Sequence, residues 1–169
     1  IQMVPEIVDD VVADAVQKTV KRKGAHELTV KMPEDILVVP MNSQLISQVL
    51  INLIDNAFKH SRPDSHVEVA AWSADDGVHF SVSDDGGGID PAVLPRVFDR
   101  FYTTNGGNGA RSGMGLGLSI CKGIVEAHGG TITARNNENG GATFEFVQPA
   151  AENATADELV NDESEERMQ

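Results

Sequence analysis

The stretch that decides the fold is Gln44–Ser61, QLISQVLINLIDNAFKHS. At about 100° per residue its apolar side chains fill a broad arc of the helical wheel, and its polar ones share a narrow stripe. We therefore expect a helix that is buried over most of its circumference. The apolar arc contains Leu45, Ile46, Val49, Leu50, Ile51, Leu53, Ile54, Ala57 and Phe58; the polar stripe contains Gln48, Asn52, Asp55, Asn56 and Lys59.

Two carboxamides in that stripe, Asn52 and Asn56, lie one helical turn apart. Asparagine is a poor residue for a helix interior because its side chain competes for backbone hydrogen bonds. A use for the two carbonyl oxygens would explain them, and Mg²⁺ is a candidate because it takes few protein oxygens beside water and phosphate. A solvated polar edge explains them equally well.

Length and composition indicate one domain with a sizeable core, since the chain has 169 residues and 40% hydrophobic content. The net charge of −13 argues against nucleic-acid binding and against contact with an anionic membrane. No apolar run approaches membrane-spanning length and no signal-peptide pattern opens the chain, so we expect a cytoplasmic, soluble piece. The single Cys121 fits a reducing compartment.

The final segment differs in composition, with seven acidic residues and one arginine between Ala150 and Gln169. We expect a globular domain over residues 1–149 and a disordered acidic tail over 150–169.

Hydrophobic periodicity predicts the elements that surround the central helix. They are a helix over Pro5–Lys23, strands at Glu27–Met32 and Ile36–Val39, a hairpin of Val67–Trp72 with Val78–Ser83, helical turns over Pro91–Arg100, a mobile loop over Tyr102–Ser112, a helix over Gly115–His128, and a hairpin of Thr131–Ala134 with Ala142–Val147.

A glycine-rich turn, Asp84-Asp-Gly-Gly-Gly-Ile89, follows the strand that ends at Ser83. The period of two aims the Asp84 carboxylate toward the apolar face of the strand and Asp85 away from it. Such a carboxylate needs a donor, which an adenine amine would supply, and the glycines allow backbone to approach a flat ring. The alternative is a carboxylate that only caps the turn.

A second glycine-rich stretch, Gly113-Met-Gly-Leu-Gly-Leu118, opens the helix predicted from Gly115. It sets unpaired amides and the positive end of a helix dipole where a polyphosphate could bind. Neither the dinucleotide-binding nor the P-loop spacing is present, and a flexible linker is the alternative. The five histidines show no metal-ligand spacing.

In chain order, Asn52–His60, Asp84–Ile89, Val97–Tyr102 and Gly113–Leu118 resemble the N, G1, F and G2 boxes of the catalytic ATP-binding (GHKL) domain of bacterial sensor histidine kinases. Pro40-Met41 and His128–Ala134 further resemble the Kdp-type, potassium-responsive sensor kinases. The resemblance implies an α/β (α+β) fold of the Bergerat type, a two-layer sandwich with a mixed, mostly antiparallel sheet packed against helices on one face.

The resemblance also implies a role for each matching residue. Asn56 and Asn52 would bind Mg²⁺, Lys59 would lie near the nucleotide and Arg100 near its phosphates. His60 and Asp84 would meet the adenine, and Phe98 and Phe101 would anchor a lid. The remaining nucleotide-binding positions would be Gly86, Gly88, Ile89, Tyr102, Gly113, Met114, Gly115, Leu116, Gly117, Leu118 and Thr143.

The implied function is to bind Mg-ATP and to donate its γ-phosphate to a histidine on a separate dimerisation and phosphoacceptor domain, upstream of a response regulator. His26-Glu27-Leu28 lacks the rest of a phosphoacceptor motif, so we expect no self-phosphorylation by this piece, whose parent would be a membrane-bound sensor. One alternative is a gyrase- or chaperone-type ATPase, which would carry a glutamate base where Asn52 stands. A nucleotide-sensing module without transfer activity is another.

Overall fold

A computed structural model describes residues 1–100 and 117–150. Several of the predictions lie outside these residues: the lid and its anchor Phe101, the positions Tyr102, Gly113, Met114, Gly115 and Leu116, and the acidic tail from residue 151 onward.

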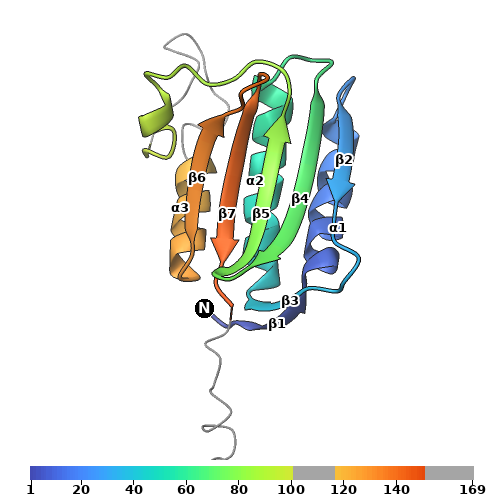
Figure 1. Cartoon of the computed structure of the whole chain (residues 1–169), viewed down its shortest axis with the longest axis vertical. Coiled ribbons are helices and arrows are strands. Elements are labelled where there is room, and N and C mark those ends of the chain that lie inside the picture. Colours follow the sequence, from blue (N-terminus) through green and yellow to red (C-terminus); the bar gives the residue numbers. More distant parts are fainter. Residues whose placement is uncertain (101–116, 151–169) are drawn as a thin grey trace, which may run out of the picture.

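The described residues form two layers, a five-stranded sheet and helices that cover one of its faces (Figure 1). The strand order is β2-β4-β5-β7-β6; β2 pairs with β4 in parallel and the other pairs are antiparallel. This arrangement confirms the predicted mixed, mostly antiparallel sandwich. The strands are β2 (Glu27–Lys31), β4 (His66–Ala74), β5 (Gly77–Asp84), β6 (Thr131–Asn136) and β7 (Ala142–Gln148), and the helices are α1 (Val8–Thr19), α2 (Ser43–His60) and α3 (Gly117–Ala127).

The central helix α2 lies within one residue of its predicted bounds at both ends. Asn42 caps its first turn, where the side-chain Oδ1 accepts a hydrogen bond from Leu45 N at 3.1 Å. Each large aliphatic side chain that is buried stabilises the fold by about 1.5–3 kcal/mol. Because α2 buries five such side chains fully, it forms the centre of the core. Its fully buried side chains are Ile46, Val49, Leu50, Leu53 and Ile54.

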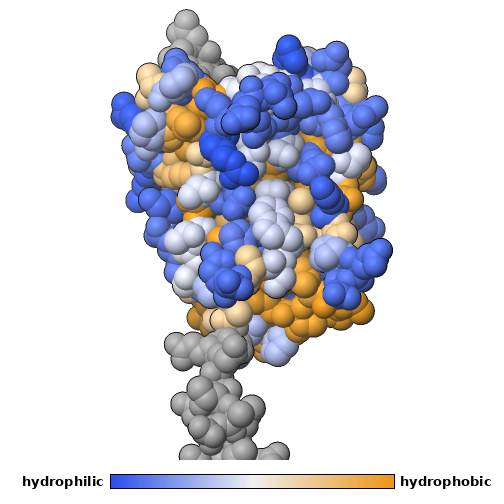
Figure 2. All heavy atoms as spheres, viewed as in Figure 1, coloured by the Kyte–Doolittle hydropathy of each residue, from blue (hydrophilic) through white to orange (hydrophobic). Residues whose placement is uncertain are grey.

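The N-terminus differs from the prediction. The helix expected from Pro5 begins at Val8, because β1 (Val4–Ile7) pairs with β3 (Val38–Met41) in a separate two-stranded ribbon. The partner segment lies more than 30 residues away in the chain, so the local helical spacing could not reveal the pairing. Several side chains of this ribbon are exposed and apolar, and Figure 2 shows their hydrophobic surface at the lower edge of the molecule.

The two predicted hairpins are present, and the strands of both are longer than expected: β4 and β5 meet at Asp75-Asp76, and β6 pairs with β7. Their core face carries Phe80 and Phe146, whose rings stack at 4.8 Å. Their outer face is mostly hydrophilic (Figure 2). There Trp72 stacks on His79 with ring centroids 5.3 Å apart.

The predicted turns before Arg100 contain one 3-10 helix, Leu94–Arg96, and another 3-10 turn, Val20–Arg22, continues α1. None of the helices within the described ranges is both long and apolar enough to span a bilayer.

Candidate functional site

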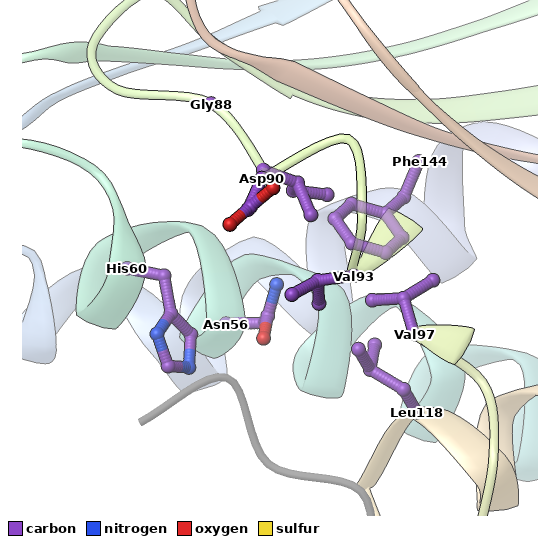
Figure 3. A pocket seen from close by; sticks show the side chains of 9 residues that line it. Asn56, His60, Gly88, Asp90, Val93, Val97, Leu118 and Phe144 are labelled. Atoms are coloured by element: carbon purple, nitrogen blue, oxygen red, sulfur yellow. The ribbon is translucent and has the colours of Figure 1, made fainter. Parts of the chain in front are cut away.

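A cavity of about 240 Å³ lies where the last turns of α2 meet the loop after β5, the segment around the 3-10 helix Leu94–Arg96, the start of α3 and strand β7 (Figure 3). This is smaller than the roughly 300–1,000 Å³ of a typical small-molecule site. The cavity therefore has room for only part of a nucleotide. Its lining is Asn56, His60, Gly88, Ile89, Asp90, Val93, Val97, Leu118 and Phe144.

The polar side of the cavity comes mainly from α2. Asn56 and His60 lie one turn apart on this helix, and the amide of Asn56 points into the cavity, with the Asp90 carboxylate across from it (Figure 3). Burial, and then the charge of Lys59, lower the pKa of His60. His60 is therefore a neutral imidazole at neutral pH, able to lie against an uncharged ring.

The opposite side is apolar and combines residues that are distant in sequence. Val93 and Val97 come from the segment after β5, Leu118 from the first turn of α3 and Phe144 from β7. Phe98 meets Phe144 edge to face, with ring centroids 6.0 Å apart. A wall of this kind suits the apolar face of a flat ligand.

The glycine-rich turn after β5 reaches the cavity through its second half. Asp84 is half-buried, and its Oδ1 accepts a hydrogen bond from Gly86 N at 3.2 Å. Burial raises the pKa of Asp84, while hydrogen bonds from the amides of Gly86 and Ala142 oppose that rise. Asp84 itself is not among the residues that line the cavity.

The glycines of this turn serve two different needs. A Cβ at Gly86 would lie 2.6 Å from the Cβ of Ser65, so protein packing requires the absence of a side chain there. Gly88 has a φ of +118°, which favours glycine, and it lines the cavity.

Of the predicted site residues, the structure brings together Asn56, His60, Gly88, Ile89 and Leu118. Others lie elsewhere: Asn52 Oδ1 accepts a hydrogen bond from Gln48 Nε2 at 2.9 Å, and Thr143 Oγ1 donates one to Asn137 Oδ1 at 2.6 Å. The remaining described positions that do not line the cavity are Lys59, Gly86, Arg100 and Gly117, and Lys59 and Arg100 are exposed.

Sequence reasoning missed Asp90, Val93, Val97 and Phe144 as lining residues. For Phe144 a signal was present, because it alternates with Phe146 along a strand and shares its core face. Asp90 and Val93 lie in irregular backbone, where no periodicity indicates which way a side chain points.

His26 lies outside this cavity and is buried. Its Nε2 is 3.0 Å from Phe58 O and its Nδ1 is 3.1 Å from Ser65 O. A ring held this way is closed to a phosphate donor, which agrees with the sequence-based rejection of His26 as a phosphoacceptor.

Within residues 1–100 and 117–150 no cluster of three or more His, Cys, Asp or Glu side chains could hold a metal ion. The donors at the cavity are instead an amide oxygen, Asn56, and one carboxylate, Asp90. A few oxygens of this kind fit Mg²⁺ that keeps most of its water and substrate phosphate ligands, and they do not fit a closed protein cage.

Two curated relatives are sensor proteins named KdpD. The protein from Clostridium acetobutylicum is 47% identical over 85% of this chain, and that from Escherichia coli K12 is 36% identical over 72% of it. The matches cover 16% and 14% of those proteins, so the chain corresponds to about one sixth of their length or less.

Among solved structures, the catalytic domain of the histidine kinase ThkA superposes with a TM-score of 0.77 at 28% identity, covering 88% of this chain and 96% of that one. ThkA has also been solved in complex with the response regulator protein TrrA, with a TM-score of 0.74 at 27% identity, covering 88% of this chain and 42% of that one. A family model described as histidine kinase-, DNA gyrase B- and HSP90-like ATPase matches residues 41–152, and the chain belongs to this family.

Proposed function

We propose that this chain is the catalytic domain of a bacterial sensor histidine kinase of the Kdp type. It binds Mg-ATP at the cavity at the end of α2, with only part of the nucleotide inside the cavity. It then donates the γ-phosphate to a histidine on a separate dimerisation and phosphoacceptor domain. Residues 1–149 form the catalytic unit in this proposal, and the phosphorylated histidine then supplies a response regulator.

The observation that carries the proposal is the meeting of Asn56 and His60 with Gly88 and Ile89 around one cavity. These residues belong to two separate motifs in the chain, and only the fold joins them. In a member of an ATPase family, an amide and a neutral imidazole beside a glycine loop and an apolar wall suit the flat, uncharged base of a nucleotide.

Phosphoryl transfer asks the protein mainly to position the phosphate and to neutralise its charge. The Asn56 amide oxygen would hold Mg²⁺, which when bound supplies electrostatic stabilisation to the phosphates. His60 and the apolar wall of Val97, Leu118 and Phe144 would enclose the base and exclude water from it. The exposed Lys59 and Arg100 do not line the cavity, so they would act only by approaching the phosphates from outside.

The partners in the proposal follow from the relatives. ThkA forms a complex with a response regulator, and a comparable partner would accept the phosphate downstream of this chain. The chain's acidic net charge of −13 disfavours nucleic acid as an alternative partner.

Nucleotide binding is tested by calorimetric titration of the whole chain with ATP and ADP, with and without Mg²⁺. Asn56→Ala is expected to abolish the Mg-dependent part of binding, whereas Asn139→Ala, an exposed asparagine in the β6–β7 turn, is the matched control and should bind like the wild type. Asn52→Ala then decides whether the second carboxamide is a ligand: because Asn52 bonds to Gln48, we expect a small effect. Unchanged Mg-ATP affinity in Asn56→Ala would remove this residue from the site.

Transfer is tested separately, with ATP labelled at the γ-phosphate and a purified phosphoacceptor helix pair from a related sensor kinase. Acid-labile label on the acceptor histidine is the expected result. Binding without label on the acceptor would reject transfer and leave a nucleotide-sensing module. ATP turnover by the chain alone would favour the ATPase alternative.

A further inference from the structure

The loop Asp84–Ile89, called here the β5 loop, has little regular structure of its own, yet its end forms one wall of the cavity. One side of it is fixed by the connection between α2 and β4. Arg62 N donates to Gly86 O at 3.0 Å, and His66 N donates to the carboxylate Oδ1 of Asp85 at 2.7 Å. These bonds hold the first half of the loop, which does not line the cavity.

The second half of the loop is held from the opposite side by Asn136, the last residue of β6. The side-chain Oδ1 of Asn136 accepts a hydrogen bond from Ile89 N, and its Nδ2 donates one to Ile89 O, both at 2.7 Å. The neighbouring Asn137 donates from Nδ2 to Asp84 O at 3.0 Å, so consecutive asparagines hold both ends of the loop.

The two hydrogen bonds of Asn136 fix the position of Ile89 more specifically than apolar packing would. A carboxamide carries a donor and an acceptor side by side, and here it serves both polar groups of one residue, as a neighbouring strand would. Ile89 sits between Gly88 and Asp90, and all three line the cavity. The contact is also close: a Cβ on Gly88 would lie 3.3 Å from Asn136 Oδ1.

We propose that Asn136 is a positioning residue of the nucleotide site, which sets the distance of the Gly88–Asp90 wall from Asn56 through its two hydrogen bonds to Ile89. The proposal rests on the nucleotide-binding function proposed above. Asn136 does not line the cavity and touches the ligand site only through Ile89.

The test compares Asn136→Ala with Asn139→Ala in the whole chain, by titration with Mg-ADP and by thermal unfolding. Both side chains are exposed in or beside the same turn, so neither substitution opens a core cavity. With two hydrogen bonds lost, the loop wall is no longer fixed, and we expect Asn136→Ala to bind Mg-ADP about tenfold more weakly. Asn139→Ala should match the wild type.

Three further readouts separate positioning from simple destabilisation. The NMR amide signal of Ile89 should shift and its hydrogen exchange should accelerate in Asn136→Ala alone. With a phosphoacceptor domain, the KM for ATP should rise while kcat stays close to that of the wild type. Asn136→Asp, which keeps the acceptor for Ile89 N and loses the donor to Ile89 O, should also bind more weakly than the wild type.

The outcomes are distinguishable. A wild-type chain that binds no nucleotide overturns the proposed function. A wild type that binds, with Asn136→Ala equal to Asn139→Ala in affinity, overturns the positioning role alone, even if the melting temperature falls. Should Asn136→Ala not fold, the affinity of Asn136→Asp decides: a loss supports the proposal and wild-type affinity overturns it.

Discussion

Replacing Gly86 with alanine should destabilise the protein and weaken nucleotide binding through the same movement. Gly86 is buried in the β5 loop, directly beside the α2–β4 connection. A methyl group at this position would lie 2.6 Å from Ser65 Cβ and 3.1 Å from Arg62 Nε. Ordinary contacts between carbon atoms are about 3.5–4.0 Å, so the loop must move by about an ångström to accept it.

The loss of stability in Gly86→Ala follows from the contacts between the β5 loop and the α2–β4 connection. Overpacking of this kind costs about 1–3 kcal/mol. The same movement stretches the bond from Arg62 N to Gly86 O, at 3.0 Å, whose loss adds about 1 kcal/mol. Alanine also restricts the unfolded chain more than glycine does, which stabilises the folded state by about 0.4–1 kcal/mol. We therefore expect a net loss of about 1–3.5 kcal/mol, which for a chain of this size lowers Tm by about 2–14 °C.

Urea unfolding followed by circular dichroism measures the loss, and Gly123→Ala is the matched control. Gly123 is exposed in the middle of α3, and a Cβ there meets nothing within 4 Å. Helix propensity alone should then stabilise this variant by up to about 1 kcal/mol. A Gly86→Ala protein within about 0.5 kcal/mol of the wild type would refute the reasoning, because it would mean that the β5 loop is not held against Ser65.

Two further predictions concern groups away from the cavity. Burial lowers the pKa of His79, but its hydrogen bonds to Asp76 (2.7 Å) and Glu145 (3.0 Å) and their charges outweigh burial and raise that pKa. The protonated ring therefore stabilises the fold fully below about pH 6.5. The difference in unfolding free energy between the wild type and His79→Gln, measured by urea unfolding, should shrink as pH rises through the raised pKa. A difference that does not depend on pH would contradict this. Burial raises the pKa of Cys121 to about 12. Its thiol should therefore resist a disulfide reagent at pH 8 in the native protein and react once the protein is unfolded. Rapid reaction of the native protein would show that α3 opens.

The parts of the fold that were predictable from sequence are those whose signal is local. In α2 the apolar arc and the polar stripe are both written within 18 residues, and the predicted bounds are off by one residue. The β4–β5 hairpin has its turn signal between its strands. Asp84 half-buried and Asp85 exposed follow from simple alternation along β5.

What the sequence could not supply depends on contacts between distant segments. Pro5 reads as the first turn of a helix, yet it lies opposite Pro40 in the β1–β3 ribbon. The cavity lining likewise depends on hydrogen bonds that fix the irregular backbone of the β5 loop. Ile89 was expected from a resemblance, but Asn136, which fixes it, lies 47 residues away and gave no signal beyond an asparagine before a glycine turn.

The placement of the cavity between two helix ends sets how a nucleotide should lie in it. Asn56 and His60 belong to the last turns of α2, where the helix dipole is negative and a polyphosphate is disfavoured. Leu118 belongs to the described start of α3, the positive end of that helix. A bound nucleotide is therefore expected to direct its base toward His60 and Gly88, and its phosphates toward α3.

In that orientation the Asn56 amide meets the ligand between base and γ-phosphate, where a metal ion held by one protein oxygen is most useful. The charge of the phosphates then favours Mg²⁺ at an amide over a carboxylate, because the amide adds no repulsion. Asn56→Asp tests this orientation: a carboxylate should hold the free ion better and the Mg-nucleotide complex worse than asparagine does. Calorimetry that found tighter Mg-ATP binding in Asn56→Asp would contradict this orientation.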